Sequence, residues 1–527
     1  MSEPLGRRFS EWGTVLREIG TVLLVGAALM LTCAGCGALY QEWHAAGAFV
    51  VSAVATAAIG GWFSWKFRNA PEPQTVQAMT IAGASWIAVS VLGSLPFFLA
   101  AHVTPEGVME SYVPSGADYS SSLLYFRNPL HAIFESVSGW TTTGLTMAVH
   151  EPSLPHAHLL YRSMQQWLGG AGVIVLALAL LHRPGTVGGY LLYRAEGREE
   201  RLRPTLIGTA RVIWRVYVAV TAATAFYLFV CTLIFLPDYP VAHALFDAVN
   251  HAMAGQSTGG FSVLDDSIAS YSSLAMDIVH IPPMVSGAIA IPVHYAALTR
   301  KSLMEFLRDG QTRVMLAIMM LGCVCLSVLL VGSSGVSAPY REGVFQFISA
   351  VSTTGWQTSA IGDWTPTPVL FIVFAAMIAG GCAGATVGGI KILRVMIMVR
   401  GFFWQVRRLF LPPSAVAVFR LGNEVLDRTE MEEEIGRAAI FTVCYLFLLA
   451  VGVFVLALTM GPGFTLADMT FESVTAQSTV GLSSGITSPD MPVAAEVMFI
   501  VQMLAGRLEI IPLVVLARSV FRGFGRQ

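Results

Sequence analysis

The sequence contains ten apolar stretches of about 20 residues or more, each long enough to cross a lipid bilayer as an α-helix. Because the bilayer core has no water to bond the backbone, only α-helices and closed β-barrels can span it. The chain is 55% hydrophobic and 12% charged, which excludes an ordinary soluble domain. We therefore predict an all-α integral membrane protein whose termini share a side. The stretches lie near 18–40, 46–66, 77–101, 157–181, 212–236, 274–298, 314–335, 368–398, 438–460 and 493–517.

Arginine and lysine collect at one end of these stretches, and such residues are retained on the cytoplasmic side of short loops. The opposite side carries only Arg127, Arg162 and Arg341. We therefore predict a multi-pass protein of the cell inner membrane with both termini cytoplasmic. The basic residues on the predicted cytoplasmic side are Arg7, Arg8, Arg17, Lys66, Arg68, Arg183, Arg194, Arg198, Arg201, Arg203, Arg300, Lys301, Arg308, those from Arg394 through Arg437, Arg518, Arg522 and Arg526.

Four other apolar segments are too short to cross a bilayer, and each lies between an odd and an even span on the outer side. These segments are roughly 128–140, 244–256, 343–352 and 467–478. Segments of this length at membrane depth are candidate re-entrant helices. Irregular backbone after them is tolerated where it lines a water-filled cavity or is enclosed by protein. The pattern predicts a pore.

The same short motif, [Ser/Thr]-Thr-x-Gly followed by an apolar residue, ends each of these four segments. An internal repeat of this kind, with one pair of spans per unit, predicts two N-terminal helices followed by four helix–re-entrant pore helix–helix repeats around one pore. The copies are Thr141-Thr142-Thr143-Gly144-Leu145, Ser257-Thr258-Gly259-Gly260-Phe261, Ser352-Thr353-Thr354-Gly355-Trp356 and Ser478-Thr479-Val480-Gly481-Leu482. The predicted units are an N-terminal helix pair at 1–70 and pore repeats at 71–200, 201–312, 313–430 and 431–527.

The motif has the chemistry of a potassium filter. A dehydrated potassium ion needs a cage of carbonyl oxygens, which the Thr-Val-Gly-Tyr-Gly loop of potassium channels supplies. Glycine adopts backbone conformations that a Cβ forbids, and each short helix directs its partially negative C-terminal end at the cavity. We expect potassium as the substrate and no cofactor in this chain. The predicted filter residues are Thr142, Thr143, Gly144, Thr258, Gly259, Gly260, Thr353, Thr354, Gly355, Thr479, Val480 and Gly481.

These motifs resemble the Trk/Ktr/HKT superfamily of potassium transporters over nearly the whole chain. Four segments are most similar to the bacterial Trk membrane subunit: Tyr161 to Gly170, Asn250 to Met253, Gly380 to Thr386 and Gly506 to Glu509. The resemblance implies a homodimer in the membrane, in contact with lipid and docked on a cytoplasmic nucleotide-binding ring of the RCK type. The fourth filter, from Gln477 to Ser483, is closer to the Ktr pattern.

The span after the third filter contains the glycine-rich run Gly380–Gly389. Glycine costs about 1 kcal/mol per helical position, so we predict two helices joined by a loop. The family resemblance implies that this loop lies under the filter as a gate, with Gly384 and Lys391 in it and Arg507 holding it. Two alternatives remain: Arg507 pairs with an acid such as Glu472 or Glu509, and Lys391 snorkels to the interface. Pro282, Pro283 and Pro292 predict a kink in the span after the second filter.

Four polar residues occupy equivalent positions on the short helices, and we expect them to brace the filter rather than bind ions. They are Glu135, His251, Gln346 and Glu472.

Other classes of protein fit the sequence less well. Gly481-Leu482-Ser483-Ser484-Gly485 matches a hydrolase nucleophile motif, but that motif needs a strand-to-helix turn, and this copy follows a re-entrant helix. We expect no enzyme activity and no nucleic-acid partner. The alternative is a polytopic secondary carrier for an organic solute, although such carriers repeat as two halves. Whether flux is channel-like or coupled to protons or sodium stays open.

Overall fold

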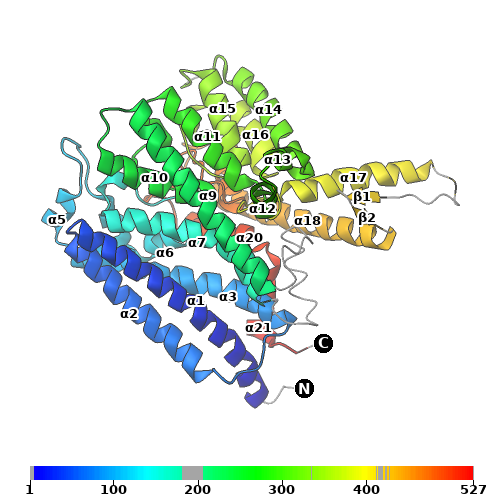
Figure 1. The fold of residues 1–527 in the computed structure, drawn as a ribbon, viewed down its shortest axis with the longest axis horizontal. Helices are drawn as coiled ribbons and strands as arrows, with labels where there is room; N and C mark the ends of the chain where they lie inside the picture. The colour runs from blue at the N-terminus through cyan, green and yellow to red at the C-terminus, as the bar shows by residue number, and fades with distance from the viewer. Residues whose placement is uncertain are drawn as a thin grey trace.

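The computed structural model describes residues 5–180, 206–333, 335–410, 412, 419–421, 424–426 and 428–525. Its N-terminal helices α1 (Leu5–Leu39) and α2 (Trp43–Lys66) lie side by side along one edge of the molecule (Figure 1). Gly20 and Gly60 meet where the two helices cross, and a Cβ on either would collide with the carbonyl oxygen of the other. Small residues let helices approach closely in a membrane, so this pair packs as one unit.

The rest of the chain repeats one arrangement four times: a long helix, a short helix ending in the filter motif, and a second long segment. The first repeat contains α3 (Thr75–Gly93), α4 (Leu95–Val103), α6 (Pro129–Trp140) and α7 (His156–Leu180). The second contains α9 (Leu206–Phe235), α10 (Val241–Gln256), α11 (Leu274–Ala288) and α12 (Ile291–Arg300). The third contains α14 (Gly310–Leu330), α15 (Pro339–Val351), α16 (Pro366–Ile372), a π-helical turn (Val373–Met377) and α17 (Ile392–Leu409). The fourth contains α18 (Arg428–Thr459), α19 (Leu466–Gln477), α20 (Val493–Leu508) and α21 (Ile511–Arg522).

The four predicted re-entrant helices are thus present as α6, α10, α15 and α19, although the exact repeat boundaries remain a prediction. The boundary at 200/201 and the basic residues from Arg183 to Arg203 lie outside the described residues. Short helices fill the connections: α5 (Glu106–Ser111), α13 (Met304–Arg308) and the 3₁₀ turns Ser122–Arg127, Glu151–Ser153, Ser267–Tyr271 and Ile361–Asp363.

The long segments are less regular than ten straight spans. Six helices are long and apolar enough to cross a membrane, or up to eight if each of two bent pairs is one span, within the described residues. The other two predicted spans are α7 and the segment near 368–398, which is interrupted as predicted. The predicted span over 493–517 is not one straight helix, because α20 and α21 meet at 110°. Glu509 and Ile510 take positive φ of 63° and 61° there.

The predicted kink after the second filter is present, and it lies directly before Pro292. Helices α11 and α12 meet at 102° around Ile289 and Ala290, whereas Pro282 and Pro283 lie inside α11. Proline is tolerated at the first helical positions, and Pro292 occupies that position in α12.

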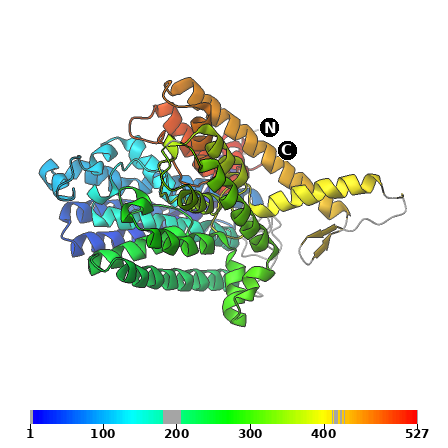
Figure 2. The same cartoon turned by 90° about the horizontal axis from the view of Figure 1, so that it is seen from above.

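Helices α17 and α18 project from the body of the molecule (Figures 1 and 2). Near their tips lies a two-stranded antiparallel hairpin, β1 (Phe419–Leu421) with β2 (Glu424–Leu426), in which Phe419 pairs with Leu426. The chain is otherwise helical where it is described, so this hairpin is the small exception to the all-α prediction.

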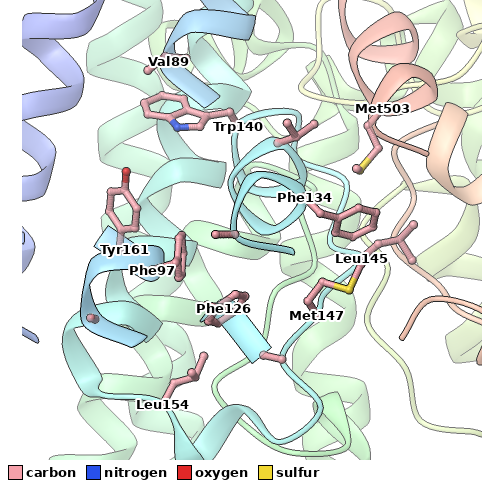
Figure 3. Packing of buried hydrophobic residues seen from close by; sticks show 14 of the residues in the cluster. Val89, Phe97, Phe126, Phe134, Trp140, Leu145, Met147, Leu154, Tyr161 and Met503 are labelled. Atoms are coloured by element: carbon pink, nitrogen blue, oxygen red, sulfur yellow. The ribbon is translucent and has the colours of Figure 1, made fainter. Parts of the chain in front are cut away.

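Each pore helix is enclosed by apolar side chains from its neighbours. Around α6, Phe134 and Trp140 are buried beside Phe126 and Tyr161 of their own repeat and Met503 of α20 (Figure 3). Close-packed side chains of this kind transmit small displacements rather than absorb them. The loop that follows each pore helix is therefore held by a rigid support.

Candidate functional site

The four filter loops share one backbone conformation. In each loop, the amide before the conserved glycine donates a hydrogen bond to a carbonyl five residues earlier in the pore helix, over 2.8–3.0 Å. The threonine at the second position of each motif and the conserved glycine both take positive φ. The threonines are Thr142 (56°), Thr258 (51°), Thr353 (52°) and Thr479 (50°), and the glycines are Gly144 (92°), Gly260 (79°), Gly355 (88°) and Gly481 (89°). The sequence predicted the glycines, but it did not predict left-handed threonines, which are strained.

The loops close into a ring in the order of the repeats. A Cβ added to Gly144 would collide with the Gly259 carbonyl oxygen, and one on Gly260 would collide with that of Thr354. A Cβ on Gly355 would meet the Val480 oxygen, and one on Gly481 would meet the Thr143 oxygen. Each conserved glycine therefore packs against the residue before the glycine of the next repeat, and repeat four returns to repeat one. All twelve predicted filter residues lie in the motif copies that form this ring.

A cavity of about 760 Å³ opens on one side of the ring, and we call it the vestibule. The four conserved glycines and residues after them line it, together with the carboxylates Glu151, Asp265, Asp266 and Asp363. Burial raises the pKa of Glu151 to about 8, because its effect exceeds the opposing effect of the nearby Arg162. Carboxylates around such a mouth raise the local concentration of cations.

The residues expected to brace the filter contact the segment that follows it. Glu135 accepts bonds from the Thr146 hydroxyl (3.0 Å) and the Met147 amide (2.8 Å). Glu472 accepts five from Ser483, Ser484 and Thr487, at 2.5–3.1 Å. Both acids therefore make the contacts that bracing of the filter requires.

The equivalent side chains of the other two repeats lie in the same place. His251 Nε2 is 3.1 Å from the Ser262 hydroxyl. With its amide turned to accept, Gln346 receives bonds from the amides of Thr358 (2.9 Å) and Ser359 (3.1 Å).

On the side of the filter away from the vestibule lies the glycine-rich loop, residues 378–391, which joins the π-helical turn to α17. The Thr386 hydroxyl is 3.1 Å from the Thr258 hydroxyl and donates to the Gly287 carbonyl at 3.2 Å. The Gly388 amide donates to the Thr353 hydroxyl at 3.4 Å. The loop therefore contacts two of the left-handed threonines at the base of the ring.

The glycine-rich loop also occupies the bend of the second repeat. The Ile291 amide donates to the Gly384 carbonyl, and the Cys382 amide donates to the Ala288 carbonyl, both at 3.1 Å. These bonds satisfy backbone groups that the break between α11 and α12 leaves without helical partners. The glycine-rich loop therefore stabilises the break between α11 and α12 at this position.

Arg507 bonds to backbone carbonyls rather than to Glu472. Its guanidinium donates to the carbonyls of Thr386, Gly169 (3.0 Å) and Gly170 (2.8 Å), so it joins the glycine-rich loop to α7. Of the alternatives, contact with the loop is the one that the structure contains. The side chain is 6% exposed, so these bonds form in a nearly dry environment.

Lys391 is buried and ion-paired, so the alternative that it snorkels to the interface is wrong. Its Nζ lies 3.1 Å from Glu509, which also pairs with Arg394 at 2.5 Å. Glu509 stands at the bend of the last repeat, and the sequence suggested it only as a partner for Arg507. The pairing could not be read from spacing, because Lys391 and Glu509 belong to different repeats.

Comparisons with known proteins agree with one another. A family model described as TrkH, cation transport protein, matches residues 46–522. The chain is 31% identical over 463 residues to an uncharacterized cation transporter of Methanocaldococcus jannaschii, covering 87% of this chain and 86% of that protein. It is 30% identical over 524 residues to the Trk system potassium uptake protein TrkH of Escherichia coli strain K12, covering 96% and 98%. The crystal structure of the potassium transporter TrkH from Vibrio parahaemolyticus matches with a TM-score of 0.77 and 25% identity, over 97% of this chain and 99% of that one.

Proposed function

The chain belongs to the TrkH family of cation transport proteins, and we propose that it carries out potassium uptake through one pore formed by its four filter loops. It is a multi-pass membrane protein. The relatives named as potassium uptake proteins and the potassium transporter of similar fold support the choice of ion.

The closed ring of filter loops is the observation that carries this proposal. Four copies of the motif, at 142–144, 258–260, 353–355 and 479–481, surround one axis, with each glycine packed on the next loop. A cage of carbonyl oxygens replaces the hydration shell of a potassium ion. An acidic vestibule on one side supplies cations to it.

The proposal is tested with purified full-length protein in proteoliposomes. Bi-ionic reversal potentials should show a permeability to potassium well above that to sodium. Uptake of a labelled sugar or amino acid in the same vesicles tests the alternative, a secondary carrier for an organic solute. Solute uptake without potassium current would overturn the pore. Varying the proton and sodium gradients independently decides whether flux is coupled.

We propose that the glycine-rich loop is the gate, with Gly384, Lys391 and Arg507 as its anchoring residues. The loop lies at the base of the filter ring, and its contacts with Thr258 and Thr353 support an obstruction at that depth. Arg507 holds the loop at Thr386, and the pair of Lys391 with Glu509 holds its C-terminal end. Opening would require these contacts to be exchanged for others.

We propose further that the protein is a homodimer in the cell inner membrane, with both termini cytoplasmic, and that a cytoplasmic RCK-type nucleotide-binding subunit regulates it. The distribution of arginine and lysine supports the orientation, and the names of the relatives assign them to a Trk system. Light scattering of the detergent-solubilised protein tests the dimer. Cysteine accessibility at Ser2 and Gln527 variants in intact cells tests the orientation. Co-purification from native membranes tests the subunit.

A further inference from the structure

Helix α7 belongs to repeat one, yet two of its polar side chains contact filter loop two, residues 257–262. Arg162 and Gln166 lie four positions apart and so occupy one face of the helix. They are 1% and 0% exposed. Nothing in the filter motif itself points to either residue.

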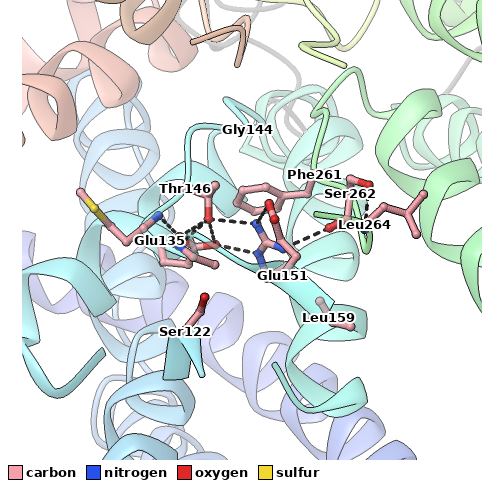
Figure 4. A network of polar contacts seen from close by, with 12 residues as sticks. Ser122, Glu135, Gly144, Thr146, Glu151, Leu159, Phe261, Ser262 and Leu264 are labelled. Carbon is pink, nitrogen blue, oxygen red and sulfur yellow. Dashed lines mark hydrogen bonds and ion pairs between the residues drawn. The ribbon is translucent and has the colours of Figure 1, made fainter. Parts of the chain in front are cut away.

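Arg162 contacts the segments after two filter glycines at once. Figure 4 labels its partners Glu135, Thr146 and Ser262. The Arg162 Nε donates to Glu135 at 2.7 Å, and another nitrogen donates to the Thr146 hydroxyl at 3.0 Å, two residues after Gly144. The third nitrogen donates to the Ser262 carbonyl at 3.1 Å, two residues after Gly260. The guanidinium also lies 4.1 Å from the centre of the Phe261 ring. A planar fork makes these contacts together, which an ammonium group cannot do.

Gln166 contacts the filter loop itself. Its Nε2 donates to the Gly259 carbonyl at 2.6 Å, and its Oε1 accepts from the Phe261 amide at 3.1 Å. The Gly259 oxygen is also the atom against which Gly144 of repeat one packs. One side chain therefore fixes the backbone on both sides of Gly260.

The other boundaries between repeats are built differently. Loops three and four are joined by a neutral amide, since Gln357 Nε2 donates to the Ser483 carbonyl at 3.1 Å. Loops four and one meet through buried apolar residues that include Leu145, Met147 and Ile486. The segments after the second and third filter glycines are joined by an amide and a hydroxyl, since the Gln357 backbone amide donates to the Ser267 hydroxyl at 3.1 Å. Among the residues that the structure describes, the boundary between loops one and two is thus the one where a buried cation bonds both sides.

We propose that Arg162 and Gln166 are positioning residues that set the ion preference of the filter by fixing loop two against loop one. This inference rests on the proposed function, because it assumes that the ring selects among cations. A carbonyl cage discriminates by the number and placement of its oxygens, so a displaced loop two weakens the preference for potassium. Neither side chain touches the ion; both act through the loop.

The test measures two quantities in the full-length protein: the potassium-to-sodium permeability ratio and the melting temperature in detergent. Arg162→Lys keeps the charge but loses the fork, and Gln166→Leu keeps the volume but loses both bonds. We expect each to lower the ratio roughly threefold to tenfold, as one or two weakened hydrogen bonds would. Gln165→Leu is the matched control, because Gln165 is equally buried but bonds Ser136 within repeat one. It should leave the ratio unchanged.

A double variant separates positioning from folding. Arg162→Gln alone leaves Glu135 buried without its cation, which destabilises a protein strongly. Adding Glu135→Gln removes that charge, so the melting temperature should recover while the ratio stays low. Parental ratios in folded Arg162→Lys and Gln166→Leu would overturn the inference, as would an equal loss in Gln165→Leu. If no Arg162 variant folds, Gln166→Leu decides alone. A parent protein without potassium preference would overturn the proposed function instead.

Discussion

The filter ring and the layer beneath it are built from the same four repeats, but they differ in symmetry. In the ring, the four threonines have φ of 50–56° and the four glycines φ of 79–92°. Beneath it, α7 is continuous, α11 and α12 meet at 102°, the third repeat opens into the glycine-rich loop, and α20 and α21 meet at 110°.

The difference follows from what each layer does. A carbonyl cage around one ion needs equivalent oxygens from all sides, so divergence of one loop would unbalance it. A gate needs a segment with two arrangements, and one irregular segment among regular ones supplies it. The asymmetric layer meets the symmetric one where Thr386 and Gly388 contact the threonines of the second and third filters.

The largest effect is expected in the ring. Gly144→Ser places a Cβ against the Gly259 carbonyl at a residue with φ of 92°, so the loop must shift. We expect the potassium-to-sodium permeability ratio to fall at least tenfold, which corresponds to a change of about 1.4 kcal/mol in the relative preference for the two ions. Reversal potentials measure it. Gly116→Ser is the control, since Gly116 also has positive φ but has open space around it. A parental ratio in Gly144→Ser would remove Gly144 from the filter.

A smaller effect is expected when the anchor of the glycine-rich loop is removed. Arg507→Ala deletes the donor to Thr386, Gly169 and Gly170. Loss of about 1–3 kcal/mol of coupling would shift the closed population by roughly 5- to 150-fold, so we expect basal potassium flux to rise with selectivity retained. Flux assays at matched expression measure the change. Shortening Gly380–Gly389 in the same protein should add little, since both changes relieve one obstruction. Reduced flux together with reduced selectivity would show that Arg507 supports the filter instead.

Lys391→Ala should act in the same direction but less strongly. Lys391 shares Glu509 with Arg394, which remains paired at 2.5 Å and keeps the carboxylate from being left alone. We expect basal flux to rise by no more than about threefold, which corresponds to less than about 1 kcal/mol. Glu509→Gln removes both ion pairs and should raise basal flux more than Lys391→Ala does. An effect of Lys391→Ala equal to that of Glu509→Gln would mean that Arg394 contributes nothing to holding the loop.

How much of this the sequence could predict differs between the layers. The ring was predictable because the same motif recurs in each repeat, with the pore helices and the glycines at matching positions. The left-handed threonines were not, because strain of that kind is held by surrounding structure rather than by local preference. The ring geometry imposes it on Thr142 and its three counterparts.

Beneath the filter, only glycine and proline gave a signal. Gly380–Gly389 correctly predicted a loop, and the prolines correctly predicted a kink, which lies directly before Pro292 and is bonded to the loop through Ala288 and Ile291. The bend at Glu509 is followed by Pro512 at the start of α21, but no kink was predicted from that proline. The bend depends on ion pairs with Lys391 and Arg394, more than 100 residues earlier in the chain.

The smallest expected effect concerns the vestibule and pH. Burial raises the pKa of Glu151 to about 8, against the nearby Arg162 and with help from Glu135 and Asp265. The protonated form is therefore favoured by folding: this contribution to stability is complete below the ordinary pKa of a glutamate and is lost as pH rises through 8. Over the same interval the vestibule gains one negative charge beside Asp265, whose carboxylate lies 2.9 Å from His150.

An added charge at the mouth raises the local potassium concentration, and its reach is about 10 Å at 0.1 M salt. We expect potassium flux at low potassium to rise up to about twofold between pH 7 and pH 9, and less at high ionic strength. Glu151→Gln should flatten this rise without changing flux at pH 7, where the parent side chain is already mostly neutral. Asp363→Asn is the comparison, because Asp363 lines the same cavity. Removing its charge should lower flux at both pH values and leave the rise with pH in place. A rise of flux with pH that persists in Glu151→Gln would assign the titration to another group.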